Sequence, residues 1–176
     1  LNPPQYAHLP MIVNDQGKPY SKRDGDAFVG EFRDKGYLAE ALFNYLTLLG
    51  WSPGDDREKL SRSELVALFS LDRVQSSAAQ MDLRKLQNLN GQYLAELPPA
   101  EFLGLVRKYL DTHDWGTEVA DEELTEVAAL MQTRTKLLTD VGTWKYFFVD
   151  TPEYDEKAGR KFLSKPEVAA ALTELE

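Results

Sequence analysis

The sequence predicts a mostly α-helical protein with a short strand-like stretch at its N-terminus. Apolar residues recur at helical spacing through most of the chain, most regularly over residues 38–49, where Leu, Ala and Tyr side chains share one broad face. Helix start signals punctuate this pattern, such as Ser61 with Glu64 at capping-box spacing and Asp82 before a later periodic segment. A chain of 176 residues that is 43% hydrophobic is also long enough to bury a core.

The first part of the chain differs from the rest. Prolines interrupt residues 1–10, and residues 11–13 (MIV) are β-biased, so we expect a single short strand that ends in a turn over residues 14–17. The Gly-flanked loop 17–25 (GKPYSKRDG) follows. Such composition often marks a plain solvated turn, but it also presents three cations and a hydroxyl, which suit a polyphosphate. These groups belong to Lys18, Lys22, Arg23 and Ser21.

The helices after the loop have start and stop signals. Asp24 or Asp26 is expected to cap a short helix over residues 27–33 that Gly36 closes. The leucine-rich helix comes next, and the turn after it contains Trp51. We expect Trp51 to anchor the core, although a tryptophan in a turn can also stack on a base.

Three more helices are expected between residues 61 and 110. They are opened by the capping box at 61–64, by Asp82, and by the prolines at 98–99, since proline is tolerated in a first helical turn. The second of them carries Arg84 and Lys85 on the face opposite its leucines. A polar linker at 111–117 then marks a candidate boundary inside the second half of the chain.

Four helical segments are expected after this linker. They are residues 121–138, a turn capped at 139–140 that leads into 144–148, residues 155–163, and a last helix from Ser164. The aromatic segment 144–148 (WKYFF) either packs a second helical core or offers a platform for unpaired bases. The long first helix carries Arg134 and Lys136, which either contact phosphates or form a solvated face.

Composition excludes several classes of site. The chain has no Cys and two His residues, so neither a disulfide framework nor a thiolate zinc site is expected, and no metal site is predicted. There is no apolar run of about 20 residues and no signal-peptide pattern, and we expect an intracellular, cytoplasmic protein. Because the sequence begins at Leu1 and its last helical pattern stops uncapped at Glu176, we expect a fragment of something longer.

The charge distribution bears on a nucleic-acid partner. The net charge of −9 disfavours one, because phosphate binding relies on Lys and Arg. However, residues 1–110 hold 13 Lys and Arg against 14 Asp and Glu, whereas residues 111–176 hold 7 against 15. A basic face is therefore possible on the first part, and the second part would bind RNA only through local patches.

Several stretches of this chain follow a known order. They are YAHLPM at 6–11, GKPYSKR at 17–23, GYLAEALFNYL at 36–46, LLGWS at 48–52, and KL with LNGQY within 85–93. In glutamyl-tRNA synthetase, a class I aminoacyl-tRNA synthetase, the patterns FAHLPL, GKKLSKRHG, GYLPEALLNYLALLGWS and FDxxKLxWLNGxYI stand in the same order. The later stretches WKYFF at 144–148 and YDE at 154–156 are similar too. The chain thus resembles the C-terminal part of this family, from its KMSKS-type loop onward.

The resemblance implies that three successive parts of the chain have different roles. Residues 1–23 would be a remnant of the catalytic domain with the loop that closes over ATP, residues 24–97 a helical region that contacts the tRNA stem, and residues 98–176 a helix-cage-like anticodon-binding region. The parent enzyme would use ATP with Mg²⁺. Ser21 and Lys22 would be catalytic, with Lys18 and Arg23 as further ATP contacts. Candidate tRNA contacts are Arg84, Lys85, Arg134 and Lys136.

The resemblance also implies substrates. The parent enzyme would be a glutamate–tRNA ligase that activates L-glutamate with ATP and transfers it to the glutamate tRNA, with the glutamine tRNA as a further candidate. In this family the HIGH motif and the glutamate pocket lie upstream of the loop, so the 176-residue chain alone is expected to be inactive. Two alternatives remain: a free-standing tRNA-binding module without catalysis, and a helical protein-interaction scaffold.

Three positions depart from the family pattern. Residues 19–20 are Pro-Tyr where the family has Lys-Leu, Met81 replaces a phenylalanine, and Asn88 replaces a tryptophan. Pro19 would stiffen a loop that is expected to move, and the first lysine of the loop is missing unless Lys18 compensates.

Overall fold

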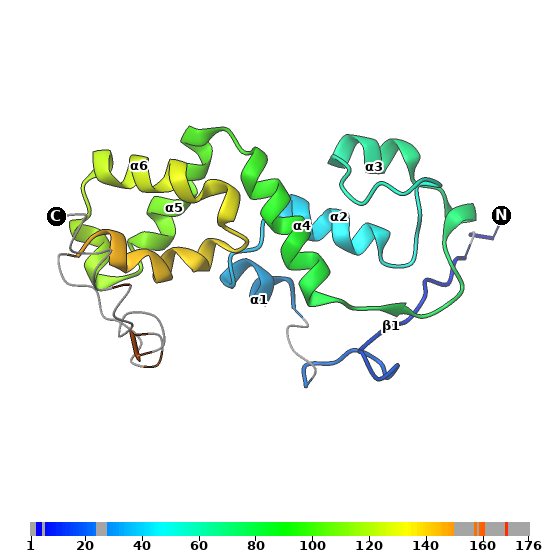
Figure 1. Ribbon diagram of the computed structural model, residues 1–176. Coiled ribbons are helices and arrows are strands. Elements are labelled where there is room, and N and C mark those ends of the chain that lie inside the picture. The colour runs from blue at the N-terminus through cyan, green and yellow to red at the C-terminus, as the bar shows by residue number, and fades with distance from the viewer. Residues whose placement is uncertain are drawn as a thin grey trace. The chain divides into compact units, whose positions relative to one another are not determined.

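The computed structural model describes residues 3–4, 6–23, 28–149, 157, 159–160 and 168. Its elements run in chain order (Figure 1): β1 (Ile12–Val13), α1 (Val29–Asp34), α2 (Ala39–Leu48), α3 (Arg62–Leu68), η1 (Leu71–Arg73), β2 (Ala79–Gln80), α4 (Leu83–Glu96), α5 (Pro99–Leu110), η2 (Asp114–Glu118), α6 (Asp121–Met131), η3 (Gln132–Arg134) and η4 (Leu138–Phe147). The protein is mostly α-helical, as the sequence predicts. None of the described helices is both long and apolar enough to cross a bilayer.

The chain divides into two compact units, Leu1–Gly142 and Thr143–Glu176. In the first unit α4 packs against α2 on one side and against η3 on the other, while α3 packs on α2 and α6 on α5 (Figure 1). The main core lies where α1, α2 and α4 meet. Its buried residues are Phe32, Leu42, Tyr45, Met81, Leu86 and Leu89.

A two-stranded parallel sheet joins the N-terminal stretch to the start of α4. Ile12 of β1 pairs with Ala79 of β2, and Val13 pairs with Gln80. The sequence predicts the first strand but not the second, because residues 76–80 (SSAAQ) carry no alternation of apolar and polar side chains. The single short strand expected within residues 1–13 is thus confirmed as β1, whereas its partner β2 is not predicted. The pairing fixes β1 directly beside Asp82, the N-cap residue of α4.

The two ends of α1, the short helix after the loop, are set by different residues. Phe28 is its N-cap residue, and the Phe28 backbone N–H donates to Glu31 Oε2 at 2.9 Å. The predicted caps Asp24 and Asp26 lie outside the described residues. At the other end Gly36 has φ +85°, a left-handed conformation that glycine adopts without strain. The predicted stop at Gly36 is thus confirmed.

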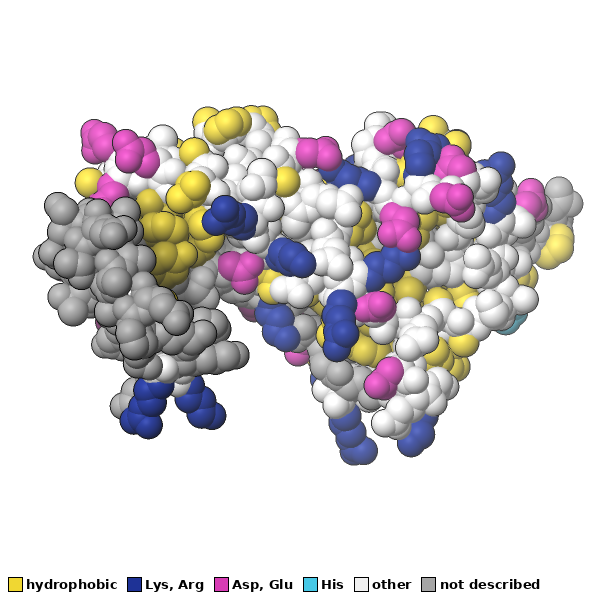
Figure 2. Space-filling view, viewed as in Figure 1, with side chains coloured by type: hydrophobic (Ala, Val, Ile, Leu, Met, Phe, Trp, Pro, Cys, Tyr) yellow, Lys and Arg dark blue, Asp and Glu magenta, His cyan; other side chains and the backbone are white. Residues whose placement is uncertain are grey.

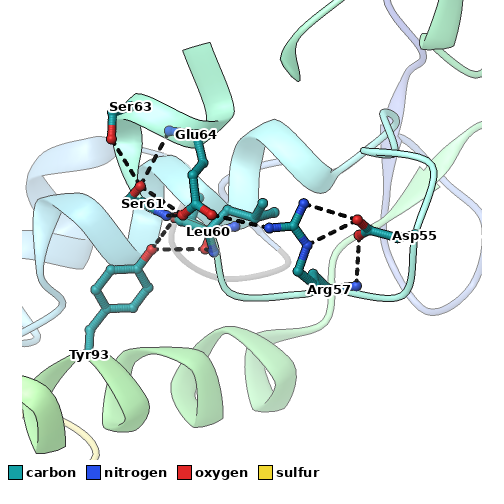
Figure 3. A network of polar contacts seen from close by, with 8 residues as sticks. Asp55, Arg57, Leu60, Ser61, Ser63, Glu64 and Tyr93 are labelled. Carbon is teal, nitrogen blue, oxygen red and sulfur yellow. Dashed lines mark hydrogen bonds and ion pairs between the residues drawn. The ribbon is translucent and has the colours of Figure 1, made fainter. Parts of the chain in front are cut away.

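A second, smaller core lies under α3, and a polar network covers it (Figure 3). Trp51 is only 3% exposed there, which confirms its predicted role as an anchor. The capping box is also confirmed, since Glu64 N–H donates to Ser61 Oγ and Ser61 N–H donates to Glu64 Oε2. Arg57 bridges the Glu64 and Asp55 carboxylates at 3.1 and 3.0 Å.

Three side chains of this network have shifted pKa values. The backbone N–H of Ser61 and that residue's hydroxyl lower the pKa of Glu64, and the backbone N–H of Arg57 lowers the pKa of Asp55. Burial, reinforced by the Glu40 carboxylate, raises the pKa of Tyr93 to about 12. The Tyr93 hydroxyl therefore stays protonated at neutral pH and donates to the Leu60 carbonyl at 2.7 Å.

The helix after the linker is shorter than the sequence predicts. The expected helix over 121–138 ends at Met131, because the Gln132 side chain donates to the carbonyls of Leu94 and Leu97 at the end of α4 and so fixes a 3₁₀ turn there. Asp140, which the sequence predicts to cap the turn after it, bonds to residues that precede it. Asp140 Oδ2 accepts the backbone N–H groups of residues 136 and 137, which precede it.

The second unit is described over its first seven residues and at four later positions. The ring centroids of Tyr146 and Phe147 lie 4.2 Å apart, and Tyr146 is 52% exposed while Trp144 is buried. The aromatic segment is thus divided between packed and exposed rings. The helices expected at 155–163 and from Ser164, and the YDE stretch at 154–156, lie outside the described residues apart from single positions.

Candidate functional site

The loop predicted to bind a polyphosphate projects from a hairpin that follows β1. Asn14 organises the turn, since its side-chain oxygen accepts the backbone N–H groups of Gln16 and Lys18 at 3.0 and 2.9 Å. The chain then returns alongside β1, where the Tyr20 N–H donates to the Ile12 carbonyl at 2.9 Å. Lys18 therefore lies at the turn of the hairpin, exposed to solvent.

The two residues that depart from the family pattern hold the base of this loop. Pro19 forms an antiparallel bridge with Val13, a position at which a residue without an N–H is tolerated at the edge of a sheet. Tyr20 is half-buried and packs against the main core beneath it. The Pro-Tyr pair thus fixes the point from which the next three residues extend.

Ser21, Lys22 and Arg23 lie together beyond this anchor, and all three are exposed. The Ser21 hydroxyl accepts the Arg23 backbone N–H at 3.4 Å. The Lys22 ammonium lies 4.2 Å from the centre of the Phe28 ring, within the range of a cation–π contact. Phe28 is 50% exposed, so one face of Lys22 is held while the rest of it stays accessible.

A second group of predicted residues begins at the N-terminus of α4. Asp82 caps the helix by accepting the N–H groups of Arg84 and Lys85 at 2.9 and 3.1 Å. Tyr45 Oη in turn accepts the Asp82 N–H at 2.7 Å, so the first turn of α4 is tied to α2. The predicted cap at Asp82 is confirmed, and it orients both basic residues outward.

Arg84 differs from its neighbour in its surroundings. Its side chain lines two open hollows, one of about 450 Å³ shared with Asn14, Tyr20 and the hairpin, and one of about 680 Å³ between α4 and the end of α2. Within the part of the chain that the structure describes, no carboxylate lies at ion-pair distance from Arg84. Lys85, by contrast, pairs with Glu58 at 2.6 Å.

The structure therefore brings Arg84 and the loop hairpin to one hollow. Figure 2 shows basic side chains along the face formed by α4 and at the tip of the hairpin below it, with acidic side chains interspersed. The net charge of residues 1–110 is close to zero, so a local basic face is possible there, and this arrangement fits one.

Arg134 and Lys136 come from another segment, at the end of η3 and just after it, and Lys136 reaches Asn88, which lines the larger hollow beside Arg84 and Lys85. The expectation that a long helix carries both is wrong, because α6 ends before them: Arg134 is the last residue of η3 and Lys136 follows it. Arg134 is exposed, whereas the Lys136 ammonium donates to Asn88 Oδ1 at 2.7 Å. Asn88, where the family pattern has a tryptophan, thus holds one of the two predicted cations.

Sequence reasoning missed two partners of the predicted residues. Phe28 under Lys22 and Glu58 beside Lys85 come from loops, where no periodic pattern assigns a side chain to a direction. A basic residue spaced a few positions from an exposed aromatic one is the only signal that would have suggested the first pair. Among the described residues, no three His, Asp or Glu side chains gather as metal ligands would.

Family models match most of the chain. Residues 1–88 match the model of tRNA synthetases class I (E and Q), catalytic domain, and residues 101–176 match an anticodon binding domain. The first match ends within α4 and the second begins within α5, which leaves residues 89–100 between them.

Individual relatives agree with the family models. The chain is 41% identical over 170 residues to a glutamate–tRNA ligase of Mycolicibacterium smegmatis, which covers 96% of this chain and 35% of that protein. It is 42% identical over 174 residues to a glutamate–tRNA ligase of Thermobifida fusca, covering 97% and 36%. This chain spans about a third of the length of these relatives.

A solved structure shows the same fold. The glutamate–tRNA ligase of Elizabethkingia meningosepticum, crystallised in complex with its amino acid, superimposes with a TM-score of 0.79 at 33% identity and covers 99% of this chain and 38% of that one. The family model over half of the chain, the relatives and this structure agree with the order of motifs in the sequence. The chain therefore belongs to the class I tRNA synthetases for glutamate and glutamine.

Proposed function

We propose that this chain is the C-terminal tRNA-binding part of a glutamate–tRNA ligase and that it also supplies the loop that closes over ATP. The observation that carries the proposal is the hairpin: it presents Ser21, Lys22 and Arg23 exposed beyond an anchored base, in a chain whose first 88 residues match the catalytic domain of this family. L-glutamate, ATP with Mg²⁺, and glutamate tRNA are the substrates of the complete enzyme, which works in the cytoplasm. The glutamine tRNA is a further candidate.

The loop residues suit the chemistry of adenylate formation. When glutamate attacks the α-phosphate of ATP, negative charge develops on the departing pyrophosphate, and a preorganised cation stabilises it. Lys22 supplies that cation and the Ser21 hydroxyl a hydrogen-bond donor, while Arg23 and Lys18 bind the outer phosphate oxygens. Exposure of all four residues fits a loop that must meet its substrate and then close over it.

The rest of the chain is assigned to tRNA. Residues 24–97 form the stem-contact region and residues 98–176 the anticodon-binding region, with residues 1–23 belonging to the catalytic domain. Arg84 is the foremost candidate for a phosphate contact, because it is exposed and forms no ion pair among the described residues, although Asp15 and Asp82 line the same hollow. Lys85 is paired with Glu58 and Lys136 is bonded to Asn88, whereas Arg134 is exposed.

Replacement of Arg84 by alanine is expected to weaken tRNA binding by about three- to tenfold and to lower the slope of log Kd against log salt concentration by roughly 0.7–0.9, the contribution of one phosphate contact. Fluorescence anisotropy with a glutamate tRNA transcript measures both. Lys85→Ala is the matched comparison on the next residue, and its effect should be smaller because Lys85 is paired. Equal effects of the two variants would contradict the assignment.

The 176-residue chain alone is expected to give no glutamate-dependent exchange between ATP and pyrophosphate. It holds no HIGH motif, which in this family lies upstream of the loop. The complete protein should give exchange under the same conditions. Exchange by the isolated chain would refute this expectation, and a complete protein that binds tRNA without any exchange would instead favour the free-standing tRNA-binding module.

A further inference from the structure

The helix α1 connects the loop to distant parts of the chain. Its N-cap residue, Phe28, lies under the Lys22 ammonium at 4.2 Å. Four residues into the helix, Phe32 is 5% exposed in the main core, where its ring meets Tyr37 edge-on at 5.6 Å. α1 is six residues long, or about 9 Å, so its two ends move together as a rigid piece.

The other end of α1 is held by residues from far along the sequence. The last carbonyls of a helix have no partner within the helix, and here three donors from two other segments, α5 and η4, reach the carbonyls at this end. The Tyr109 hydroxyl of α5 donates to the Arg33 carbonyl at 2.9 Å, and the Thr139 hydroxyl donates to the Lys35 carbonyl at 2.9 Å. The Leu138 backbone N–H donates to the Gly36 carbonyl at 3.1 Å.

A buried asparagine completes this junction. Asn90 of α4 is fully buried, its oxygen accepts the Leu38 N–H at 2.8 Å, and its amide donates to the Lys136 carbonyl at 2.6 Å. The chain that leaves α1 and the segment that precedes η4 are therefore tied to one side chain. Tyr109, Thr139 and Lys136 all lie in the stretch that matches the anticodon binding domain.

We propose that α1 positions the ATP loop from the anticodon-binding part of the chain, with Phe28 and Tyr109 as positioning residues at its two ends. The inference rests on the proposed function. Phe28 holds the Lys22 ammonium, and Tyr109 and Thr139 hold the end of α1 that determines where Phe28 lies. A shift of the anticodon-binding part therefore changes the position from which Lys22 reaches the phosphates, and ATP binding depends on the hydrogen bonds of Tyr109 and Thr139 to the far end of α1.

The test is a double-variant cycle on ATP–pyrophosphate exchange by the complete protein, with ATP varied at saturating glutamate and tRNA. Tyr109→Phe removes one hydroxyl and is expected to raise the KM for ATP by about two- to tenfold, the range for one neutral hydrogen bond. Phe28→Ala is expected to raise it by about two- to fivefold. In both variants kcat is expected to fall as well, but by less than in Lys22→Ala, because Lys22 is displaced rather than removed.

The double variant distinguishes positioning from separate structural roles. Variants at distant sites that share no partner normally have additive effects. Because both residues act through α1, the double variant is expected to have the KM of the worse single variant. The inference is overturned if the fold-changes in the KM for ATP of the two single variants multiply in the double variant, which is additivity in free energy. It is also overturned if Tyr109→Phe leaves the KM for ATP unchanged.

Control variants keep the test decisive. Thr112→Val removes a hydroxyl that donates to the Tyr109 carbonyl at 2.7 Å within the same turn, and it should leave the KM for ATP unchanged. If Tyr109→Phe does not fold, Thr139→Val breaks the neighbouring bond to α1 and takes its place in the cycle. A wild-type protein without exchange would overturn the proposed function, whereas an active wild type with additive variants would overturn the inference alone.

Discussion

Replacement of Lys22 by alanine is expected to lower glutamate-dependent ATP–pyrophosphate exchange by the complete protein by about 10²- to 10³-fold, the usual cost of removing one preorganised group that stabilises transition-state charge. The loss should appear in kcat more than in the KM for glutamate, because Lys22 lies on a loop whose proposed role begins when charge develops on pyrophosphate. Exchange of labelled pyrophosphate into ATP measures both constants.

The matched control for this variant is Lys108→Ala, which removes an exposed lysine of α5 far from the loop in sequence. It changes the net charge by the same amount and is expected to leave exchange unchanged. A Lys22→Ala protein with at least a third of the wild-type kcat would show that the loop does not act on the phosphates, whatever the similarity to its relatives.

Replacement of Gly36 by alanine is expected to destabilise the fold by about 2–5 kcal/mol. A side chain at φ +85° costs roughly 1–2 kcal/mol, and forcing a methyl group into filled space costs about 1–3 kcal/mol more. The added Cβ would lie 2.6 Å from Leu138 N and 2.8 Å from Thr139 N, which are backbone atoms that cannot turn away. Urea denaturation followed by circular dichroism measures the change.

Gly104→Ala is the control for that substitution. Gly104 is an exposed position inside α5, and an added Cβ there meets nothing within 4 Å. The same chemical change is therefore expected to stabilise the protein by about 0.8–1 kcal/mol through helix propensity. Equal effects at the two glycines would contradict the close approach of residues 138–139 to the end of α1.

Sequence reasoning succeeded where one local signal determines the structure. The caps at Ser61 and Asp82, the proline start of α5 and the glycine stop of α1 all depend on contacts within four residues, so a single sequence carries them. The burial of Trp51 followed from its place after an amphipathic helix. The order of the motifs along the chain indicated the protein family, which neither composition nor periodicity indicates.

The remaining features depend on contacts between distant segments. Parallel pairing of β1 with β2 joins residues more than sixty positions apart, and α6 ends at Met131 because Gln132 bonds to the end of α4. Periodicity continues through residue 138 and so predicts a longer helix. For the site, the sequence places the four loop residues but gives no direction to Phe28 or Tyr109, whose importance comes from what they touch.

The most direct test of the account is the charging of a glutamate tRNA transcript with labelled L-glutamate by the complete protein, beside its Lys22→Ala variant and the isolated 176-residue chain. The complete protein is expected to charge the transcript, the variant to be slower by about 10²-fold or more, and the isolated chain to bind the transcript without charging it. A folded complete protein that binds the transcript but leaves it uncharged would contradict the account.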